Sequence, residues 1–177
     1  IGAPAVPTVK IGDRVLVGMK IGEAASFISS PIFSSVSGKV KMIEDRQTVT
    51  GAISKCIIVQ NDFENECAPG FGEIRDPNAV SNEEIAEIVK QCGIVGMGGA
   101  GFPTGVKLAP KNAEDIDYLI INGAECEPYL TSDYRLMTER TGNIITGVSL
   151  ALRLFKNAKA VVAIEDNKPV SYTHLTL

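Results

Sequence analysis

The first residues that point to chemistry lie in a glycine-rich segment, Gly93–Lys107, with the sequence GIVGMGGAGFPTGVK. Five glycines fall between Gly93 and Gly101, and Lys107 follows a sixth at Gly105. Such a loop leaves backbone N–H groups free to face an anion, because no side chains shield them. A lysine just beyond the loop can supply the counter-charge. The segment therefore predicts a phosphate cradle, and the alternative is a flexible glycine hinge.

An acidic turn follows the apolar run that ends at Ile121. It brings an amide and two carboxylates, those of Asn122, Glu125 and Glu127, within six residues. Together with a phosphate cradle, these side chains predict a site for a nucleotide-type cofactor. The alternative is a loop in which Asn122 and Glu127 only cap the following helix. Cys126 has no partner cysteine nearby in the sequence, and we interpret it as a packing or backbone-hydrogen-bonding residue.

The surroundings of the glycine segment exclude two common phosphate-binding loops. Gly96–Gly101 fits the spacing G-x-G-x-x-G, but an ordinary dinucleotide-binding loop follows a strand and opens a helix. Here the predicted helix precedes the loop and the predicted strand follows it. Gly105 is followed by Val106 rather than by lysine, unlike a Walker A loop. The proline of Phe102-Pro103 stiffens the segment, which favours the cradle over the hinge.

Two long motifs carry a resemblance to a known family. GxGGAGFPTGxKL occupies residues 96–108, and NGAECEPYLTSDYRLM occupies residues 122–137. The pair resembles the flavin- and NADH-binding core of the C subunit of the Rnf electron transport complex. The same core occurs in the NADH-binding subunit of respiratory complex I. The resemblance extends over residues 1–169 and includes the N-terminal segment.

The resemblance implies that the glycine segment wraps the phosphate and ribityl chain of FMN. The glycines that would allow close approach of the backbone are Gly96, Gly98, Gly99 and Gly101. Lys107 would pair with the phosphate, and Phe102 would lie near the nicotinamide or the adenine of NADH. Complex I relatives carry arginine where Met97 stands, so one positive contact is missing from this chain.

The same resemblance places the acidic turn beside the flavin. Asn122 would hydrogen-bond the ribityl chain or the flavin edge, and Glu125 and Cys126 would line the same wall. Glu127 would approach the flavin and the nicotinamide and orient the hydride donor, so it is the residue assigned to catalysis. Complex I relatives carry aspartate where Ala124 stands, so one polar contact to the flavin is missing.

The predicted fold class is α/β, with a β-rich biotinyl/lipoyl-like half-barrel before a partial Rossmann-like α/β domain for flavin and NADH. We expect the half-barrel at 1–62, a polar linker at 63–80, and the first part of a truncated FMN/NADH-binding domain at 81–169. Residues 170–177, VSYTHLTL, resemble adapter-derived sequence fused to metagenomic reading frames, and we expect a non-native tail there. Because the chain begins at Ile1 rather than at methionine, we also expect a cut N-terminus.

Near-alternating apolar residues predict short strands in the N-terminal part. They are Val9, Ile11, Val15, Val17, Met19 and Ile21, with turns at Gly12-Asp13 and Gly18. The pattern V-x-x-G-D-x-V-x-x-G-x-x-I, with S-G-x-V further on, resembles the biotinyl/lipoyl half-barrel. A carrier domain of that type needs a lysine on its exposed hairpin, and residues 21–38 contain none. We therefore expect a structural half-barrel rather than a swinging arm.

A helix is predicted at 81–92, between the linker and the glycine segment. Ser81 can cap its first turn, with Glu84 three residues further on, which is the spacing of a capping box. Gly93 would end the helix, because glycine readily takes the left-handed conformation of a helix C-terminus.

The rest of the chain predicts two strands joined by helix. The strands are expected at 116–122 and 160–165, with a helical stretch at 131–156 between them. This order predicts parallel strands with a crossover connection. Asp133 is interpreted as the cap of the helical stretch and Arg135 as part of a surface or interface ion pair.

Composition excludes several classes of site. A net charge of −4 and a pI of about 5.1 argue against nucleic acid as a partner. The four cysteines lack the spacing of metal ligands, so no metal site is expected. No apolar run approaches the roughly 20 residues that cross a bilayer, so no direct membrane span is expected.

The resemblance implies a peripheral electron-entry subunit of a membrane Rnf-type NAD:ferredoxin oxidoreductase, which is an NADH-dependent enzyme. Hydride would pass between NADH and FMN, electrons would pass onward to iron–sulfur clusters, and partner subunits would translocate ions. The family's cluster-binding cysteines lie further downstream. We therefore expect 4Fe-4S clusters in the full-length protein but not in this fragment, which we expect to be inactive alone.

The expected partners are other Rnf complex subunits and NADH, with ferredoxin engaged indirectly. The resemblance also implies a location at the cytoplasmic face of the bacterial inner membrane. One alternative is the flavin subunit of a soluble NADH dehydrogenase or hydrogenase, which the N-terminal half-barrel disfavours. The other alternative is a non-catalytic assembly module whose half-barrel binds a partner protein.

Overall fold

A computed structural model describes residues 2–49, 51–97 and 99–175. Contacts between backbone positions divide the chain into two compact units. The first unit comprises Ile1–Asp76 and Ala86–Lys107, and the second comprises Pro77–Ile85 and Leu108–Leu177. The predicted glycine segment therefore belongs to the first unit and the predicted acidic turn to the second.

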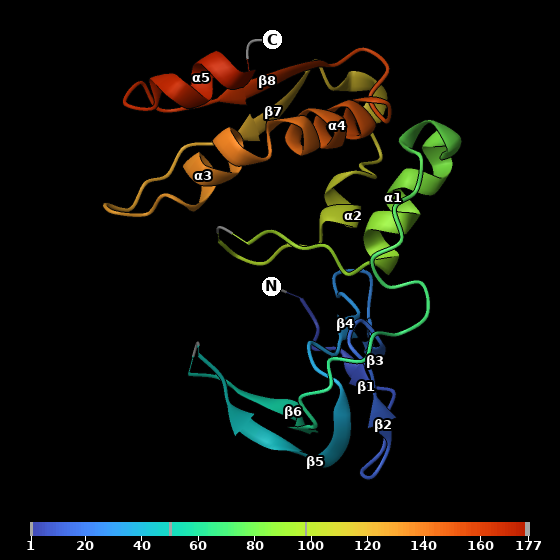
Figure 1. Cartoon of the computed structure of the whole chain (residues 1–177). Coiled ribbons are helices and arrows are strands. Elements are labelled where there is room, and N and C mark those ends of the chain that lie inside the picture. Colours follow the sequence, from blue (N-terminus) through green and yellow to red (C-terminus); the bar gives the residue numbers. More distant parts are fainter. Residues whose placement is uncertain (1, 50, 98, 176–177) are drawn as a thin grey trace. The chain divides into compact units, whose positions relative to one another are not determined.

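Within the described residues, the first unit is built mainly from six antiparallel strands (Figure 1). Four of them are short: β1 (Val6–Pro7), β2 (Arg14–Val15), β3 (Lys20–Glu23) and β4 (Ile32–Phe33). The other two, β5 (Gly38–Gln47) and β6 (Ile53–Asn61), are longer. The unit also contains helix α2 (Thr104–Lys107). One sheet has the order β1-β3-β4 and the other has the order β2-β5-β6. Strands were predicted in this region, and the structure confirms them.

Four apolar side chains form the core of these strands: Val9, Val15, Ile21 and Val40. Three of them come from the near-alternating residues of the sequence, which explains why that pattern predicts strands. Ile11, which shares the pattern, is 65% exposed. The chain turns at Gly12 and Gly18 with φ of 97° and 79°, a backbone conformation that glycine adopts without strain.

The longest strands, β5 and β6, pair antiparallel as a hairpin (Figure 1). A register shift between Val40 and Met42 marks a bulge in β5. Residues 44–61 were given no strand by the sequence patterns. The reason is that the far part of the hairpin has no buried face: Ile53 is 77% exposed and Val49 fully exposed.

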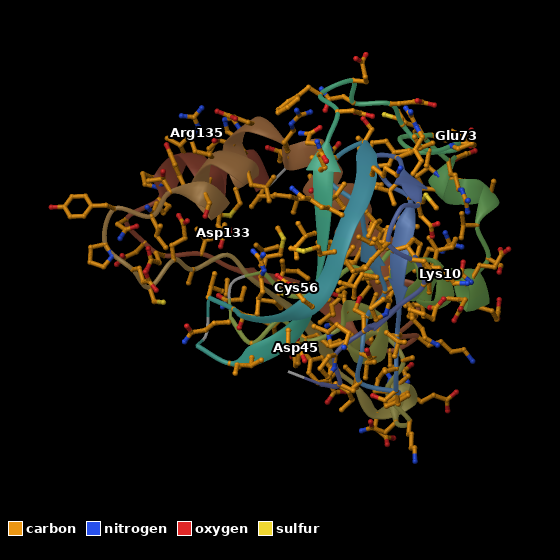
Figure 2. All side chains as sticks on the ribbon, turned by 90° about the horizontal axis from the view of Figure 1, so that it is seen from below. Lys10, Asp45, Cys56, Glu73, Asp133 and Arg135 are labelled. Carbon is orange, nitrogen blue, oxygen red and sulfur yellow. The ribbon has the colours of Figure 1, made fainter. Side chains whose placement is uncertain are left out.

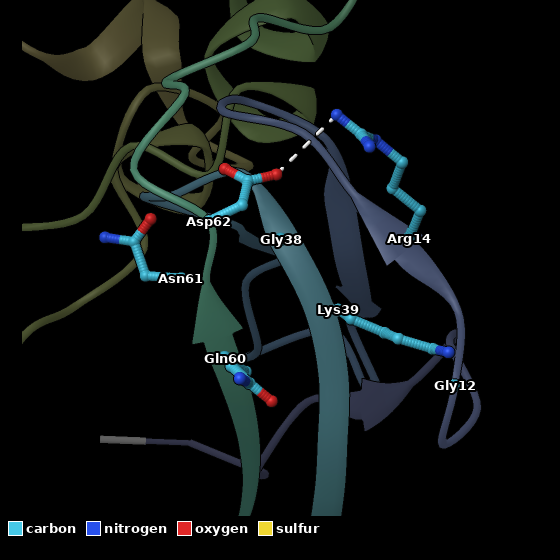
Figure 3. A pocket seen from close by; sticks show the side chains of 7 residues that line it. All are labelled: Gly12, Arg14, Gly38, Lys39, Gln60, Asn61 and Asp62. Carbon is cyan, nitrogen blue, oxygen red and sulfur yellow. Dashed lines mark ion pairs between the residues drawn. The ribbon is translucent and has the colours of Figure 1, made fainter.

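A polar cluster holds the chain that follows β6. Arg14 lies 3.6 Å from a carboxylate oxygen of Asp62 (Figure 3) and 2.5 Å from one of Glu66. The buried Ser37 hydroxyl donates to Asp62 at 2.5 Å and accepts from the N–H of Glu66 at 3.1 Å. The Ser37 hydrogen bond lowers the pKa of Asp62. The start of the predicted linker, 63–80, is therefore hydrogen-bonded to the strands of the first unit.

Helix α1 (Asn82–Gln91) has residues in both units and begins as predicted. The Ser81 N–H donates to the Glu84 carboxylate at 2.9 Å, and the Glu84 N–H donates to the Ser81 hydroxyl at 3.4 Å. These two bonds make a capping box and satisfy N–H groups that the helix itself leaves free.

The end of α1 is also as predicted. Gly93 has φ of 67°, and its N–H donates to the Lys90 carbonyl at 3.1 Å. The Ile94 N–H donates to the Val89 carbonyl at 3.2 Å, which completes a Schellman motif. A Cβ atom on Gly93 would lie 2.8 Å from the Pro31 carbonyl oxygen. Glycine is therefore required at this position by its backbone conformation and by a close approach.

The second unit contains two parallel strands and the helices around them (Figure 1). Its elements are η1 (Pro77–Ala79), η2 (Ala113–Asp115), β7 (Tyr118–Asn122), α3 (Ser132–Glu139), α4 (Thr141–Leu152), β8 (Lys159–Ala163) and α5 (Pro169–Leu175). The parallel pairing of β7 with β8 and the helical connection between them confirm the predicted β-α-β order. A mixed α/β fold is thereby confirmed for the chain.

One face of the β7–β8 pair carries exposed apolar side chains. Tyr118 is 59% exposed, Ile120 65% and Val161 41%. These residues alternate along their strands with partly buried Leu119 and Val162, as expected for a sheet covered on one face only. Among the residues described in the structure, β7 and β8 pair only with each other.

Helix α3 begins differently from the prediction. The side chain of Asp133 does not cap it, and Thr131 at the cap position makes no side-chain hydrogen bond to the helix. Arg135 forms an ion pair with Glu139 one turn further along, and Figure 2 shows Asp133 and Arg135 on this helix. The ion pair at Arg135 is confirmed, and the cap assigned to Asp133 is wrong.

The described part of the chain has no helix that combines the length and apolar character needed to cross a membrane.

Replacing Gly93 with alanine is expected to destabilise the protein. The left-handed backbone alone costs an L-residue about 1–2 kcal/mol, and the contact with the Pro31 carbonyl adds to it. Urea unfolding followed by circular dichroism measures the loss. Gly147→Ala is the matched control: Gly147 lies inside α4 with open space at the Cβ position, so alanine there should stabilise by up to about 1 kcal/mol. Equal effects of the two substitutions would contradict this account.

Candidate functional site

The base of the glycine loop is closed by backbone hydrogen bonds. The Gly96 N–H donates to the Phe102 carbonyl at 2.9 Å, and the Thr104 N–H donates to the Ile94 carbonyl at 2.9 Å. A β-bridge joins Val95 to Pro103 between them. The loop is therefore held at both ends, which favours a fixed loop over a free hinge.

Lys107 provides a positive charge beside this loop. Its Nζ lies 5.9 Å from the centre of the Phe102 ring and 3.7 Å from the position that a Cβ on Gly96 would occupy. Among the described residues, no carboxylate lies within 4.0 Å of this ammonium group. A lysine that faces a side-chain-free loop without an acidic partner suits an anionic ligand such as a phosphate.

A second glycine fixes the helix that carries Lys107. A Cβ on Gly105 would lie 2.8 Å from the Cβ of Lys90 and 3.1 Å from its Cα. Gly105 is buried, and only glycine allows α2 to pack this closely on α1. Gly105 was noted in the sequence as part of the loop, and its role in the structure is helix packing.

The outer part of the loop is open. Gly99 has no neighbour within 4 Å of its Cβ position, and Gly101 has φ of 64°. Met97 is 94% exposed, at the position where complex I relatives were expected to carry arginine. Gly98, which was predicted to contact the cofactor, lies outside the described residues.

In the acidic turn, Glu125 is tied to the start of α3. Its carboxylate accepts hydrogen bonds from the N–H groups of Asp133 at 2.9 Å and Tyr134 at 3.2 Å, and from the Ser132 hydroxyl at 3.3 Å. The Nζ of Lys168 lies 4.0 Å away. The side chain of Glu125 is 4% exposed. Glu125 therefore serves as the capping group of α3 from outside the helix.

These contacts determine the charge state of Glu125. Removal from water raises the pKa of a carboxyl group, but the hydrogen bonds from Asp133, Tyr134 and Ser132 and the charge of Lys168 outweigh that effect. The pKa of Glu125 therefore lies below its ordinary value of 4.5. The carboxylate is ionised at neutral pH.

The other predicted site residues of the turn, Asn122, Cys126 and Glu127, are exposed. The Asn122 side-chain oxygen accepts the N–H of Ala124 at 3.1 Å, which fixes the first bend. Glu127 and Cys126 are exposed, and the carboxylate of Glu127 makes no hydrogen bond or ion pair to another described residue. The packing role of Cys126 is therefore wrong, whereas its backbone hydrogen bonding stays a prediction. The cap of α3 comes from Glu125, and not from Asn122 or Glu127 as in the alternative considered above.

Two residues near the turn were missed in the sequence. Lys168 follows β8, and its link to Glu125 depends on the parallel pairing of β7 and β8. Tyr129 has φ of 67° and is fully exposed. A tyrosine in the left-handed region is uncommon and marks a strained point in the loop. The spacing of residues along the chain predicts neither the contact between Lys168 and Glu125 nor the backbone conformation of Tyr129.

A hollow of about 530 Å³ lies on the first unit (Figure 3). It is lined by Gly12, Arg14, Gly38, Lys39, Gln60, Asn61 and Asp62. None of the predicted site residues lies there. Since Arg14 is already paired with Asp62 and Glu66, the hollow is part of the cluster that holds the chain after β6.

Comparison with known families agrees with both parts of the chain. The RnfC barrel sandwich hybrid domain matches residues 1–64. The Nuo51 FMN-binding domain matches residues 89–177, which is half of the chain.

The chain belongs to the Nuo51 FMN-binding domain family.

Similar proteins are named as the C subunits of ion-translocating complexes. That of the proton-translocating ferredoxin:NAD(+) oxidoreductase complex of Clostridium ljungdahlii is 43% identical over 96% of this chain and 37% of its own length. Its Na(+)-translocating counterpart from Acetobacterium woodii is 40% identical over 95% of this chain and 38% of its own length. That of the ion-translocating oxidoreductase complex of Rhodobacter capsulatus is 42% identical over 99% of this chain and 34% of its own length.

These matches confirm the resemblance to the C subunit of the Rnf complex. The chain spans about a third of the length of the curated relatives it matches. The family matches cover residues 1–64 and 89–177, whereas the two compact units of the structure divide the chain differently. The precise domain boundaries therefore stay predictions. The non-native origin of residues 170–177 also stays a prediction.

Glu125→Gln is expected to lower the stability of the second unit and to make that stability less dependent on pH. Because the folded-state pKa of Glu125 is lowered, its charge stabilises the fold above about pH 4.5, and this stability is lost as the pH falls through the folded pKa. Thermal unfolding between pH 3 and pH 7 should show a lower melting temperature for the variant at pH 7, with convergence toward the unmodified chain in acid.

Glu114→Gln is the matched control for this prediction. Glu114 pairs with Lys156 at 3.7 Å, but both side chains are 80% exposed, so the pair contributes little. A loss in this control as large as that of Glu125→Gln would contradict the capping role.

Proposed function

We propose that this chain is the electron-entry part of a membrane Rnf-type ferredoxin:NAD oxidoreductase, and that its glycine loop and acidic turn hold FMN and receive NADH. The observation that carries the proposal is the ammonium group of Lys107. It faces the side-chain-free Gly96 and has no acidic partner among the described residues. FMN, when bound, accepts a hydride and releases electrons singly.

The glycine loop binds the anionic end of the cofactor. The backbone of Gly96, Gly98, Gly99 and Gly101 approaches the phosphate and ribityl chain, because these positions carry no side chains. Lys107 would supply the counter-charge, and Phe102 would lie near NADH. The fit is supported by the closed base of the loop and by the packing of Gly105, which fixes the helix that carries Lys107.

The acidic turn orients the reacting groups. Asn122 would contact the ribityl chain or the flavin edge, and Glu125 and Cys126 would form the wall beside them. Glu127, whose carboxylate is exposed and unengaged among the described residues, orients the nicotinamide of the hydride donor. No proton transfer by the protein is needed for hydride transfer, so the role of Glu127 is positioning and electrostatic.

The wider role follows the names of the relatives. The C subunit of a ferredoxin:NAD(+) oxidoreductase complex would pass electrons to 4Fe-4S clusters in the full-length protein, and this fragment would be inactive alone. Partner Rnf subunits would translocate ions, and ferredoxin would be engaged indirectly. We propose a peripheral position at the cytoplasmic face of the bacterial inner membrane.

The remaining structural assignments are proposals of the same kind. The first domain would be a biotinyl/lipoyl-like half-barrel at 1–62, followed by a linker at 63–80. A partial Rossmann-like domain for flavin and NADH would occupy 81–169. The match of residues 1–64 to the RnfC barrel sandwich hybrid domain supports the first of these.

Lys107→Met is expected to weaken FMN binding by the protein expressed from the complete gene. Loss of a charged hydrogen bond to the phosphate costs about 1.5–3 kcal/mol, which raises the Kd about 10- to 100-fold. Quenching of flavin fluorescence measures the Kd. Lys111→Met removes the same charge outside the loop and should leave the Kd within about twofold. An unmodified protein that folds but neither binds FMN nor responds to NADH would overturn the proposed function and favour an assembly module.

Glu127→Gln is expected to slow reduction by NADH while FMN stays bound. Loss of a positioning contact in the reacting complex should lower the rate about tenfold or more. Anaerobic stopped-flow bleaching of the flavin absorption measures the rate. Glu139→Gln is the control, because Glu139 pairs with Arg135 on the exposed side of α3. An unchanged bleaching rate in Glu127→Gln would remove Glu127 from the site.

A further inference from the structure

Lys168 occupies an unusual position in the second unit. It lies in the turn between β8 and α5, and its side chain is only 20% exposed. Its Nζ is 4.0 Å from a carboxylate oxygen of Glu125 and 5.3 Å from the centre of the Tyr134 ring. Most lysines keep their ammonium group in water, so a mostly buried one has a structural or functional reason.

The partner of Lys168 is still more buried. The side chain of Glu125 is 4% exposed, and its carboxylate is also bonded to the first turn of α3. When one member of a buried pair is removed, the other is left as an uncompensated charge, which is far more costly than the loss of a surface pair. Glu125 and Lys168 are therefore coupled, although each follows a different strand of the parallel pair.

The turn is fixed at two points. At its start, the Gly123 N–H donates to the Ala163 carbonyl at 2.8 Å, and a Cβ on Gly123 would lie 3.0 Å from the Met137 sulfur. Two residues later, Glu125 is anchored on α3. The next residues are exposed, so the direction in which Glu127 leaves the turn depends on how firmly Glu125 is held.

We propose that Lys168 is a positioning residue of the candidate site: by clamping the Glu125 carboxylate on the first turn of α3, it sets the direction in which Glu127 is presented. Lys168 does not touch the cofactor in this scheme and acts through Glu125. The effect of Lys168 on catalysis rests on the proposed function, because the direction of Glu127 influences a reaction only if the turn faces flavin and NADH. The clamp itself is a property of the second unit.

The first test measures the clamp without any cofactor. Lys168→Met keeps the apolar stem over Tyr134 and removes the charge. In the 177-residue chain, ¹³C NMR titration of the Glu125 side-chain carboxyl should show its pKa move upward in Lys168→Met and return toward the original in Lys168→Arg. Lys156→Met removes an equal charge from the exposed pair with Glu114 and should leave Glu125 unchanged. An unchanged Glu125 titration in Lys168→Met would overturn the proposal.

A double-mutant cycle covers the case in which Lys168→Met unfolds the chain. Lys168→Met should lower the melting temperature in the unmodified background and have little effect in Glu125→Gln, because the charge that Lys168 balances is then absent. Equal losses in the two backgrounds would show that Lys168 acts by packing alone and would overturn the clamp.

The second test measures the consequence for the site in the protein expressed from the complete gene. Lys168→Met should slow NADH-dependent bleaching of bound flavin about tenfold, by misplacing Glu127, while Lys168→Arg restores most of the rate. An unchanged rate would reject Lys168 as a positioning residue. If the unmodified protein holds no flavin, the proposed function fails, whereas the NMR titration still decides whether the clamp exists.

Discussion

The second unit depends on one buried carboxylate. Glu125 lies in a loop, but its charge satisfies N–H groups at the start of α3 and lies beside the ammonium group of Lys168. A helix N-terminus favours a negative charge, and a parallel strand pair brings the ends of its strands to one edge. The same side chain therefore fixes the crossover helix, the end of β7 and the turn after β8. The geometry of the whole acidic turn follows from it.

In the first unit, glycines perform two opposite tasks. Gly93 and Gly105 are needed because neighbouring backbone lies too close for a Cβ atom, so they bring α1 and α2 into place. Gly99 has open space instead, and the atoms nearest to a Cβ on Gly96 lie at 3.7–3.8 Å, an ordinary contact distance. The spacing of a glycine motif does not separate glycines required by packing from glycines with room for a side chain, whereas the distance to the nearest atom does.

The sequence predicted what depends on local chemistry. The capping box at Ser81, the helix end at Gly93 and the parallel β-α-β order are all confirmed, because each signal lies within a few residues or in a clear apolar run. The far part of the β5–β6 hairpin was missed, since it buries no continuous face. The packing role of Cys126 was wrong, because this residue is exposed. The cap at Asp133 was wrong, because Glu125 occupies the place that a local cap would take. Lys168 was missed, because it meets Glu125 only through strand pairing. Whether the site residues bind FMN stays a prediction.

The apolar strip on the β7–β8 pair has a consequence for how the chain behaves at high concentration. Ile120 and Tyr118 present a water-exposed hydrophobic surface along strands whose outer edges have no partner among the described residues. Surfaces of this kind attract one another, and salts that are excluded from protein surfaces strengthen that attraction. The net charge of −4 provides only weak repulsion against it. The apolar strip therefore makes self-association of the chain sensitive to the kind of salt in solution as well as to its concentration.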